Sequence, residues 1–285
     1  MAIKHYFAAG LTSAGFVNYF DYINNSRDGY RYILKGGPGT GKSTLIKKTG
    51  RHFEKNSDIE YFYCASDPES LDGVFIVSKN VSIVDGTAPH VIEAKMPKVQ
   101  DEIINLGEFI DSSVCAHKDE IEILLQEKKR CFNAAEHYLR AAGEVYKAQN
   151  STDTFLEYGK DFSRKLFLSA LDKNLSGLNK YKEILVANKA DTDKIRRRID
   201  RGGRGIFFSF ILDPEIFEAI EIDGVLIQNN LPFCKQAQNL LQLSKKELIM
   251  ARAAHKQIES FYKPYLDLSG LNKTAEYLIK SIEQR

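Results

Sequence analysis

The chain has 285 residues, of which 43% are hydrophobic and 27% charged, and its formal net charge is +2. This length and composition are typical of one large globular domain, or of two compact ones, that bury a core. The near-neutral charge gives no reason to expect a nucleic-acid partner, and no apolar run approaches the roughly 18 residues that a membrane span requires.

The N-terminus and the cysteines indicate a cytoplasmic protein. Residues 1–10 lack the long apolar core of a signal peptide. The four cysteines have no CxxC spacing, which favours reduced, packed thiols over disulfides or a zinc site. We therefore expect neither a membrane nor a nucleic acid among the partners, whereas a protein partner is left open and unidentified.

The first motif along the chain is GGPGTGKS at residues 36–43, which fits G-x-x-x-x-G-K-[ST] at every fixed position. Residues 30–35 before it are aromatic and β-branched and predict a strand, and residues 43–56 after it predict a helix. Strand, glycine loop and helix are the order that a phosphate-binding loop requires. Glycines let backbone N–H groups approach a polyanion, and the start of the helix adds its positive end.

This loop predicts a nucleoside triphosphate and Mg²⁺ as ligands. Lys42 should reach the β- and γ-phosphates and act in catalysis, and the hydroxyl of Ser43 should bind Mg²⁺. The cofactor-binding residues that we expect are Gly37, Pro38, Gly39, Thr40, Gly41, Lys42, Ser43 and Thr44.

A second strand is predicted at residues 59–65, and it leads into a loop at residues 66–73 that contains Asp67, Glu69 and Asp72. In an open α/β sheet, ligands bind beyond the carboxyl ends of the strands. The loop is therefore placed to orient a water molecule or to supply a base, with Asp67 and Asp72 as the catalytic candidates. Ordinary turn chemistry explains the same residues equally well.

A third strand, VSIVD at residues 81–85, is apolar and ends in Asp85, as a Walker B strand does. Asp85 is expected to hold Mg²⁺ together with the serine of the glycine loop. The next residue is Gly86 and not the glutamate that many ATPases place there, which argues against a vigorous motor-type ATPase. Thr87 and His90 follow, and we expect them to cap the loop, although either could contact a γ-phosphate.

Residues 111–150 predict one or two amphipathic helices. Such helices would form a lid over the nucleotide, a hairpin that joins two halves of the chain, or a plain packing element, and we expect the last. Residues 243–265 have the same helical character.

Four segments of the first half recur in the same order in the second half, as a tandem duplication predicts. The pairs are residues 7–12 and 167–172, 33–42 and 184–194, 61–73 and 207–219, and 81–86 and 225–230. The spacing between partners shortens steadily along the chain, which shrinking loops explain. We therefore predict a nucleotide-binding domain with C-terminal helices at residues 1–155 and a second copy at residues 156–285.

The second copy is expected to have lost its chemistry. It carries Ala187, Asn188 and Ala190 where the first copy has glycines, and Asn229 where the first copy has Asp85. Side chains would fill the space that phosphates need. We therefore predict a degenerate, non-binding scaffold and a single active site in the chain.

The segments HYFAAGLTSAGFVNYFD, ILKGGPGTGKST, ASDPESLDG and IVDGTAPH…DEIINLGE together resemble a bacterial family of tandem P-loop ATPases, which is defined by its ATP-binding motif and not by a known reaction. The resemblance covers residues 4–111 well and the rest loosely. It implies the P-loop nucleoside triphosphate hydrolase fold, an α/β fold with a mostly parallel sheet flanked by helices, and ATP as the nucleotide. Members usually carry the glycine loop in both halves, and this chain departs from them in its second half.

The function that the sequence favours is Mg²⁺-dependent binding of ATP and its slow hydrolysis, with a carboxylate from Asp67 or Asp72 orienting the water. Two alternatives stay open. One is a small-molecule kinase that uses the same loop with either aspartate as base, which the missing glutamate after Asp85 suits. The other is an interaction protein gated by the nucleotide.

Overall fold

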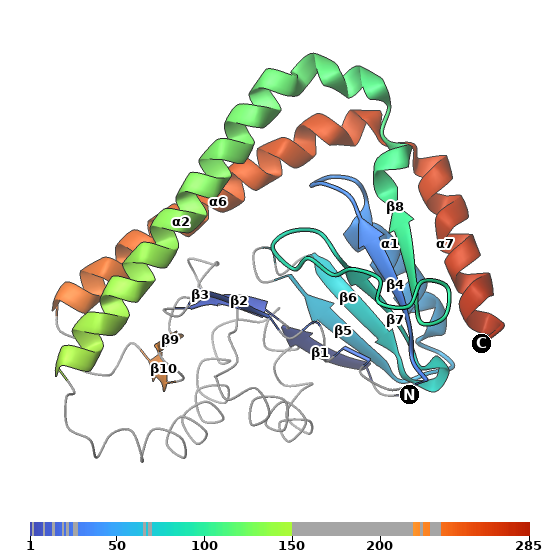
Figure 1. Cartoon of the computed structure of the whole chain (residues 1–285), viewed down its shortest axis with the longest axis horizontal. Helices are drawn as coiled ribbons and strands as arrows, with labels where there is room; N and C mark the ends of the chain where they lie inside the picture. The colour runs from blue at the N-terminus through green and yellow to red at the C-terminus, as the bar shows by residue number, and fades with distance from the viewer. Residues whose placement is uncertain are drawn as a thin grey trace. The chain divides into compact units, whose positions relative to one another are not determined.

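The computed structural model describes residues 1, 3–7, 9–12, 15–18, 20, 23–24, 28–64, 67, 70–149, 219–222, 225–228 and 235–285 (Figure 1). The chain divides into two compact units. The first unit comprises Met1–Tyr6, Tyr19–Glu127 and Ala253–Arg285, and the second comprises Phe7–Asn18 and Lys128–Arg252. The predicted division at residues 155 and 156 differs from this one, because the C-terminal segment belongs to the first unit.

The first unit is an α/β structure built on one six-stranded sheet. Its strands lie in the order β1, β5, β6, β7, β4, β8. Their bounds are Ile3–Phe7 (β1), Ile59–Tyr63 (β5), Leu71–Ile76 (β6), Val81–Asp85 (β7), Tyr30–Lys35 (β4) and Asp101–Asn105 (β8). The predicted strands around the glycine loop are confirmed, and β4 is buried at the centre of the sheet with Ile33 and Leu34 fully inaccessible.

The sheet is mixed, and the prediction of a mostly parallel sheet was wrong. Strand β4 is parallel to both β7 and β8, but β6 is antiparallel to β5 and to β7. The cause is the short connection at residues 64–70, which permits a hairpin, whereas a parallel neighbour needs a crossover of a dozen residues or more. The predicted loop at residues 66–73 consequently ends inside strand β6.

Three short 3₁₀ helices follow strands of this sheet or lead into a longer helix. The 3₁₀ helix η2 (Val77–Lys79) joins β6 to β7, and η3 (Leu106–Phe109) follows β8. A third 3₁₀ helix, η4 (Ser112–His117), leads directly into α2 (Lys118–Gln149). The helical prediction for residues 111–150 is thereby confirmed.

Two helices of the first unit pack against each other and close its core. Helix α1 (Lys42–Phe53) buries Leu45, Ile46 and Phe53, and α7 (Leu268–Glu283) follows the short turn η8 (Lys263–Tyr265). The buried residues of α7 recur at helical spacing and are Leu271, Ala275, Leu278 and Ile282. They join the same hydrophobic core as the strands.

Backbone and side-chain hydrogen bonds hold the C-terminal segment in the first unit. The N–H of Asp267 donates to the carbonyl of Phe109 over 2.7 Å, and Ile110 forms a β-bridge with Leu266. The hydroxyl of Tyr32, inside strand β4, donates to Ser281 Oγ of α7 over 2.8 Å. The last 33 residues of the chain, 253–285, are thus part of the unit that contains the glycine loop.

The second unit contains two hairpins and parts of two long helices. The hairpins pair β2 (Ala9–Thr12) with β3 (Gly15–Asn18), and β9 (Ala219–Ile222) with β10 (Val225–Gln228). Helix α2 and helix α6 (Lys235–Tyr262) meet where the buried hydroxyl of Ser244 donates to the carbonyl of Ala135 over 3.0 Å. Helix α6 covers most of the helix predicted at residues 243–265.

Several predicted features lie outside the described residues. They are the glycine-free loop at residues 184–194, the segment at residues 167–172, most of residues 207–219, and Asn229 and Glu69.

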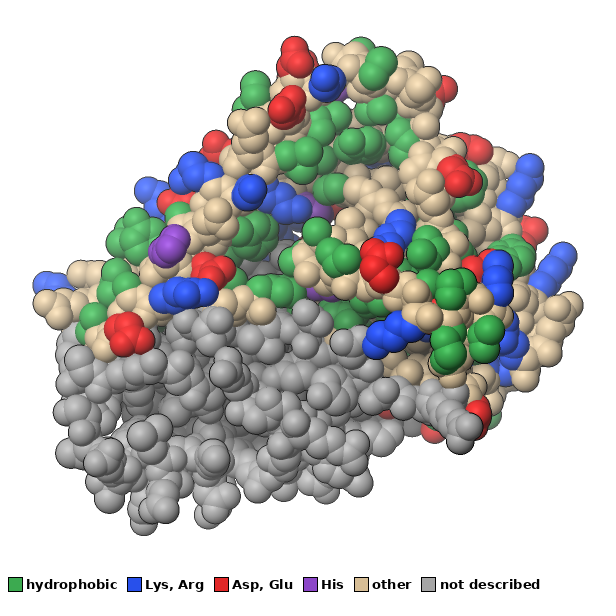
Figure 2. All heavy atoms as spheres, viewed as in Figure 1, with side chains coloured by type: hydrophobic (Ala, Val, Ile, Leu, Met, Phe, Trp, Pro, Cys, Tyr) green, Lys and Arg blue, Asp and Glu red, His purple; other side chains and the backbone are tan. Residues whose placement is uncertain are grey.

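None of the helices in the described ranges is long and apolar enough to cross a membrane. Figure 2 shows Lys and Arg side chains interspersed with Asp and Glu over the coloured part of the visible face.

The packing of α7 predicts unequal effects for two leucines of the same helix. Leu278 is fully buried, so Leu278→Ala should lower the free energy of unfolding by about 2–5 kcal/mol. Leu268 is 63% exposed, and Leu268→Ala should change it by no more than about 0.5 kcal/mol. Urea denaturation of the full chain measures both. Equal effects of the two substitutions would contradict the assignment of α7 to the core.

Candidate functional site

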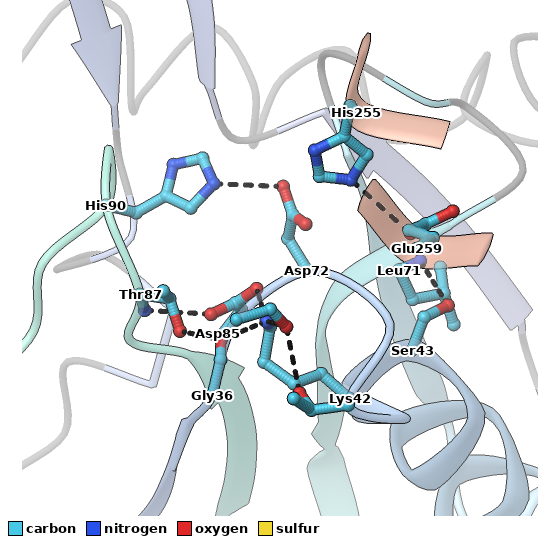
Figure 3. Close-up of polar contacts among 12 residues, drawn as sticks. Gly36, Lys42, Ser43, Leu71, Asp72, Asp85, Thr87, His90, His255 and Glu259 are labelled. Atoms are coloured by element: carbon cyan, nitrogen blue, oxygen red, sulfur yellow. Dashed lines mark hydrogen bonds and ion pairs between the residues drawn. The ribbon is translucent and has the colours of Figure 1, made fainter. Parts of the chain in front are cut away.

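The sheet brings the predicted site residues to one edge. In the register of β4 and β7, Leu34 is the partner of Asp85, so the glycine loop and the Asp85 carboxylate both follow the ends of adjacent parallel strands. Strand β6 runs the opposite way, so its beginning, with Asp72, lies at that same edge. Figure 3 shows Lys42, Asp85, Asp72 and Thr87 grouped there.

The glycine loop adopts a conformation that requires glycine at two positions. Gly39 and Gly41 have φ values of +78° and +88°, in the left-handed region that other residues rarely adopt. Gly41 is the N-cap of α1, and the first turn of that helix contains no acidic residue. The positive end of the helix is therefore not offset by a carboxylate of its own first turn.

One glycine of the loop has open space beside it. A Cβ atom built on Gly37 would meet no atom within 4 Å. The neighbouring Thr40 is buried, and its hydroxyl donates to the carbonyl of Gly37 over 2.9 Å, which fixes the loop from inside.

The C-terminal segment packs directly against the loop. A Cβ on Gly39 would lie 3.0 Å from Tyr262 Cβ and 3.1 Å from the backbone of Glu259, and one on Gly41 would lie 2.7 Å from Leu271 Cδ2. The glycines therefore permit a close approach of α6 and α7 as well as the loop's own backbone conformation. Sequence reasoning missed these residues, because nothing near the motif signals a contact more than 200 positions away.

Lys42 is held by the glycine loop and by the Asp85 carboxylate. Its Nζ donates to the carbonyls of Gly36 and Gly37, the latter over 2.8 Å, and lies 3.6 Å from Asp85 Oδ2. Both charged side chains are largely buried, with 13% of each exposed. The ammonium group thus lies between the carbonyls of the glycine loop and the Asp85 carboxylate.

Thr87 ties Asp85 to the glycine loop. Its N–H donates to Asp85 Oδ1 over 2.8 Å, and its hydroxyl donates to the carbonyl of Gly36 over 2.9 Å. The cap function predicted for Thr87 is confirmed by these two bonds, which orient the carboxylate towards Lys42.

Burial raises the pKa of Asp85. Desolvation is the largest cause, and the negative charge of Asp72 adds to it, while Lys42 and the hydrogen bonds from Thr87 oppose it. The burial of Asp85 and the nearby charge of Asp72 therefore make the charged form of Asp85 less favourable. A carboxylate whose pKa is raised by burial and by a neighbouring carboxylate is typical of a functional site.

Ser43 lies at the second residue of α1, with its hydroxyl accepting a hydrogen bond from the N–H of Leu71 over 2.9 Å. This bond connects the start of α1 to the start of β6, next to Asp72. The described ranges contain no group of three or more His, Cys, Asp or Glu side chains that could hold a metal by themselves. Mg²⁺ bound with phosphates needs only one or two protein ligands, and a hydroxyl with a carboxylate is a donor set that suits it.

The two catalytic candidates have different surroundings. Asp67 lies in a turn, where its carbonyl accepts from the N–H of Ser70 over 2.8 Å and its carboxylate from the Ser70 hydroxyl over 3.2 Å. Asp72 is 5% exposed, and its Oδ2 lies 3.3 Å from Nε2 of His90, which is 7% exposed. Of the two, Asp72 is the one whose negative charge contributes to the raised pKa of Asp85.

A second contact between a histidine and a carboxylate lies on α6, where His255 Nε2 is 3.3 Å from Glu259 Oε1. Figure 3 draws this pair in the same close-up as Asp72 and Ser43. Sequence analysis did not single out either residue.

Comparison of the chain with models of known protein families found no match, and comparisons with curated proteins and with solved structures found none either.

The raised pKa of Asp85 predicts a pH-dependent gain in stability for Asp85→Asn. The unfolded-state pKa of an aspartate is about 4, and the folded-state pKa of Asp85 lies above it. The native state then binds the proton more tightly, so its stability falls as pH rises through the interval between the two values. Asparagine does not titrate, so the Asp85→Asn variant does not lose stability in this way. The melting temperature of Asp85→Asn should therefore rise relative to wild type as the pH increases above about 4.

Thermal unfolding at several pH values measures this gain. Asp28→Asn, at an exposed position, controls for the loss of one surface carboxylate. A difference between Asp85→Asn and wild type that stays constant, or that shrinks as pH rises, would contradict the assignment.

Proposed function

We propose that the first P-loop copy binds ATP with Mg²⁺ and hydrolyses it slowly. The observation that carries the proposal is the position of Lys42. Its ammonium group lies at the mouth of the glycine loop, between the carbonyl of Gly37 and the carboxylate of Asp85. A polyphosphate entering this loop meets the ammonium group, the backbone N–H groups and the positive end of α1 together.

Each predicted binding residue has a role in this proposal. Lys42 exchanges its carbonyl partners for β- and γ-phosphate oxygens, and the loop at residues 37–41 with the first turn of α1 supplies N–H donors. Ser43 and Asp85 are the residues that would hold Mg²⁺. When bound, the ion neutralises charge on the phosphate oxygens. The pairing of Asp85 with Lys42 and Thr87 keeps the carboxylate at this place in the loop's mouth.

Asp72 is the residue that we assign to the attacking water. It is buried at the edge where β4 and β7 end, whereas Asp67 is engaged in a turn with Ser70. Gly86 follows Asp85, and no glutamate stands there to act as a stronger base. We expect slow turnover because the site lacks this stronger base, so that positioning and charge stabilisation have to provide most of the catalysis.

The hairpin of β9 and β10 supports the proposed duplication. In the first copy, Ile76 of β6 is the register partner of Val81 of β7. If the predicted offset of 146 residues is continued along β6 and that of 144 is applied to β7, their counterparts are Ile222 and Val225, and these are register partners as well. The other three pairs of the two hairpins correspond in the same way. We infer that the second half is a copy that acts as a scaffold without binding nucleotide.

Phosphoryl transfer to a small-molecule acceptor is the second candidate function. The buried Asp72 favours it, because a carboxylate at this edge can accept the proton of an acceptor hydroxyl as well as that of water. Release of ADP that requires an added metabolite would distinguish this kinase from the ATPase.

Release of ADP from Mg·ATP by the purified full chain tests the proposal. Lys42→Ala should reduce the rate by about 10²–10³-fold, since it removes the cation that faces the transferred phosphoryl group. Lys48→Ala is the matched control, because Lys48 is an exposed lysine of the same helix that bonds to Asn272. The proposal fails if Lys42→Ala hydrolyses ATP as fast as Lys48→Ala.

A further inference from the structure

The loop that follows Asp85 ends in a histidine whose place is fixed from three sides. Thr87 anchors the loop to the carbonyl of Gly36, and the N–H of His90 donates to the carbonyl of Thr87 over 3.0 Å. The imidazole stacks on Phe20 with ring centroids 4.5 Å apart and an interplanar angle of 30°. Its Nε2 lies 3.3 Å from Asp72 Oδ2. The ring can therefore neither tilt nor turn without losing one of these contacts.

The contact with His90 also determines how Asp72 is presented. Nε2 of His90 lies 3.3 Å from Asp72 Oδ2, and this oxygen makes no hydrogen bond within the described part of the chain. The histidine thus faces one side of the carboxylate as a polar partner, and the hydrogen-bonding capacity of Oδ2 is left for a ligand.

The electrostatics of the site call for such a partner. Asp72 and Asp85 repel each other, and Lys42 pairs with Asp85 at 3.6 Å. His90 supplies a basic nitrogen beside the buried Asp72 carboxylate, and removing it would leave that carboxylate buried without this partner. The side chain would then turn away from the site, and it would no longer face a bound water molecule.

We propose that His90 is a positioning residue for the phosphoryl-transfer reaction, holding Asp72 oriented towards the attacking water. This inference rests on the proposed function. In the step itself, the water oxygen forms a bond to the γ-phosphorus, and the bond from that phosphorus to the β–γ bridging oxygen breaks. ADP leaves with the electron pair, and the water proton passes to the Asp72 carboxylate and then to bulk water.

His90→Phe and His90→Gln separate this role from simple packing. Phenylalanine keeps an aromatic ring against Phe20 but has no polar nitrogen, whereas the amide nitrogen of glutamine can take the place of Nε2 beside Asp72. We expect His90→Phe to lower kcat about 10- to 100-fold and His90→Gln to stay within about threefold of wild type. The Kd for Mg·ATP should change less than twofold in both. His52→Phe is the matched control, because His52 is an exposed histidine that pairs with Glu283.

A double-mutant cycle with Asp72→Asn shows whether His90 acts through Asp72. The double variant His90→Phe, Asp72→Asn should be no slower than Asp72→Asn alone. Wild-type kcat in His90→Phe, or losses that multiply in the double variant, would overturn the role of His90 and leave ATP hydrolysis standing. A wild-type chain that releases no ADP would overturn the proposed function, and this inference with it. Circular dichroism of each variant confirms that the rates are compared between folded proteins.

Discussion

The ion pair of Lys42 with Asp85 is the interaction on which the rest of the site depends. The two side chains extend from the helix and the strand that flank the end of β4, and each is largely removed from solvent. Buried charges are stable only with partners, and here the partners are carbonyls of the glycine loop and donors of Thr87. Burial nevertheless raises the pKa of Asp85, so this carboxylate costs stability. We interpret that cost as the mark of a group retained for its chemistry.

The glycine loop has one face against protein and one face towards open space. Tyr262 and Leu271 pack where Gly39 and Gly41 have no side chain, whereas the space beside Gly37 is open. Helix α6 spans residues that belong to both units, and its last turn lies against this loop. The C-terminal segment therefore supports the conformation of the loop.

Local patterns predicted the strands and the helix around the glycine loop, with β4 and β7 at their predicted bounds. They failed where strand direction depends on the length of a connection, and where residues far apart in the sequence come into contact. The hairpin of β5 and β6 depends on the length of its connection, which the apolar pattern does not encode, so the sheet was expected to be mostly parallel. The contacts of Glu259 and Tyr262 with the loop, and the pairing of His90 with Asp72, arise from tertiary packing and leave no local trace. Of residues 156–285, where the sequence predicted a second copy, the structure describes the hairpin of β9 and β10, the helices α6 and α7 and the turn η8 between them.

The central claim is that one phosphate loop in this chain binds a nucleoside triphosphate with Mg²⁺. Calorimetric titration of the full chain with a non-hydrolysable ATP analogue tests it most directly, in the presence of Mg²⁺ and again with a chelator. The account predicts one molecule bound per chain, more weakly without Mg²⁺. No binding would contradict the assignment of the loop, and two molecules per chain would contradict the degenerate second copy.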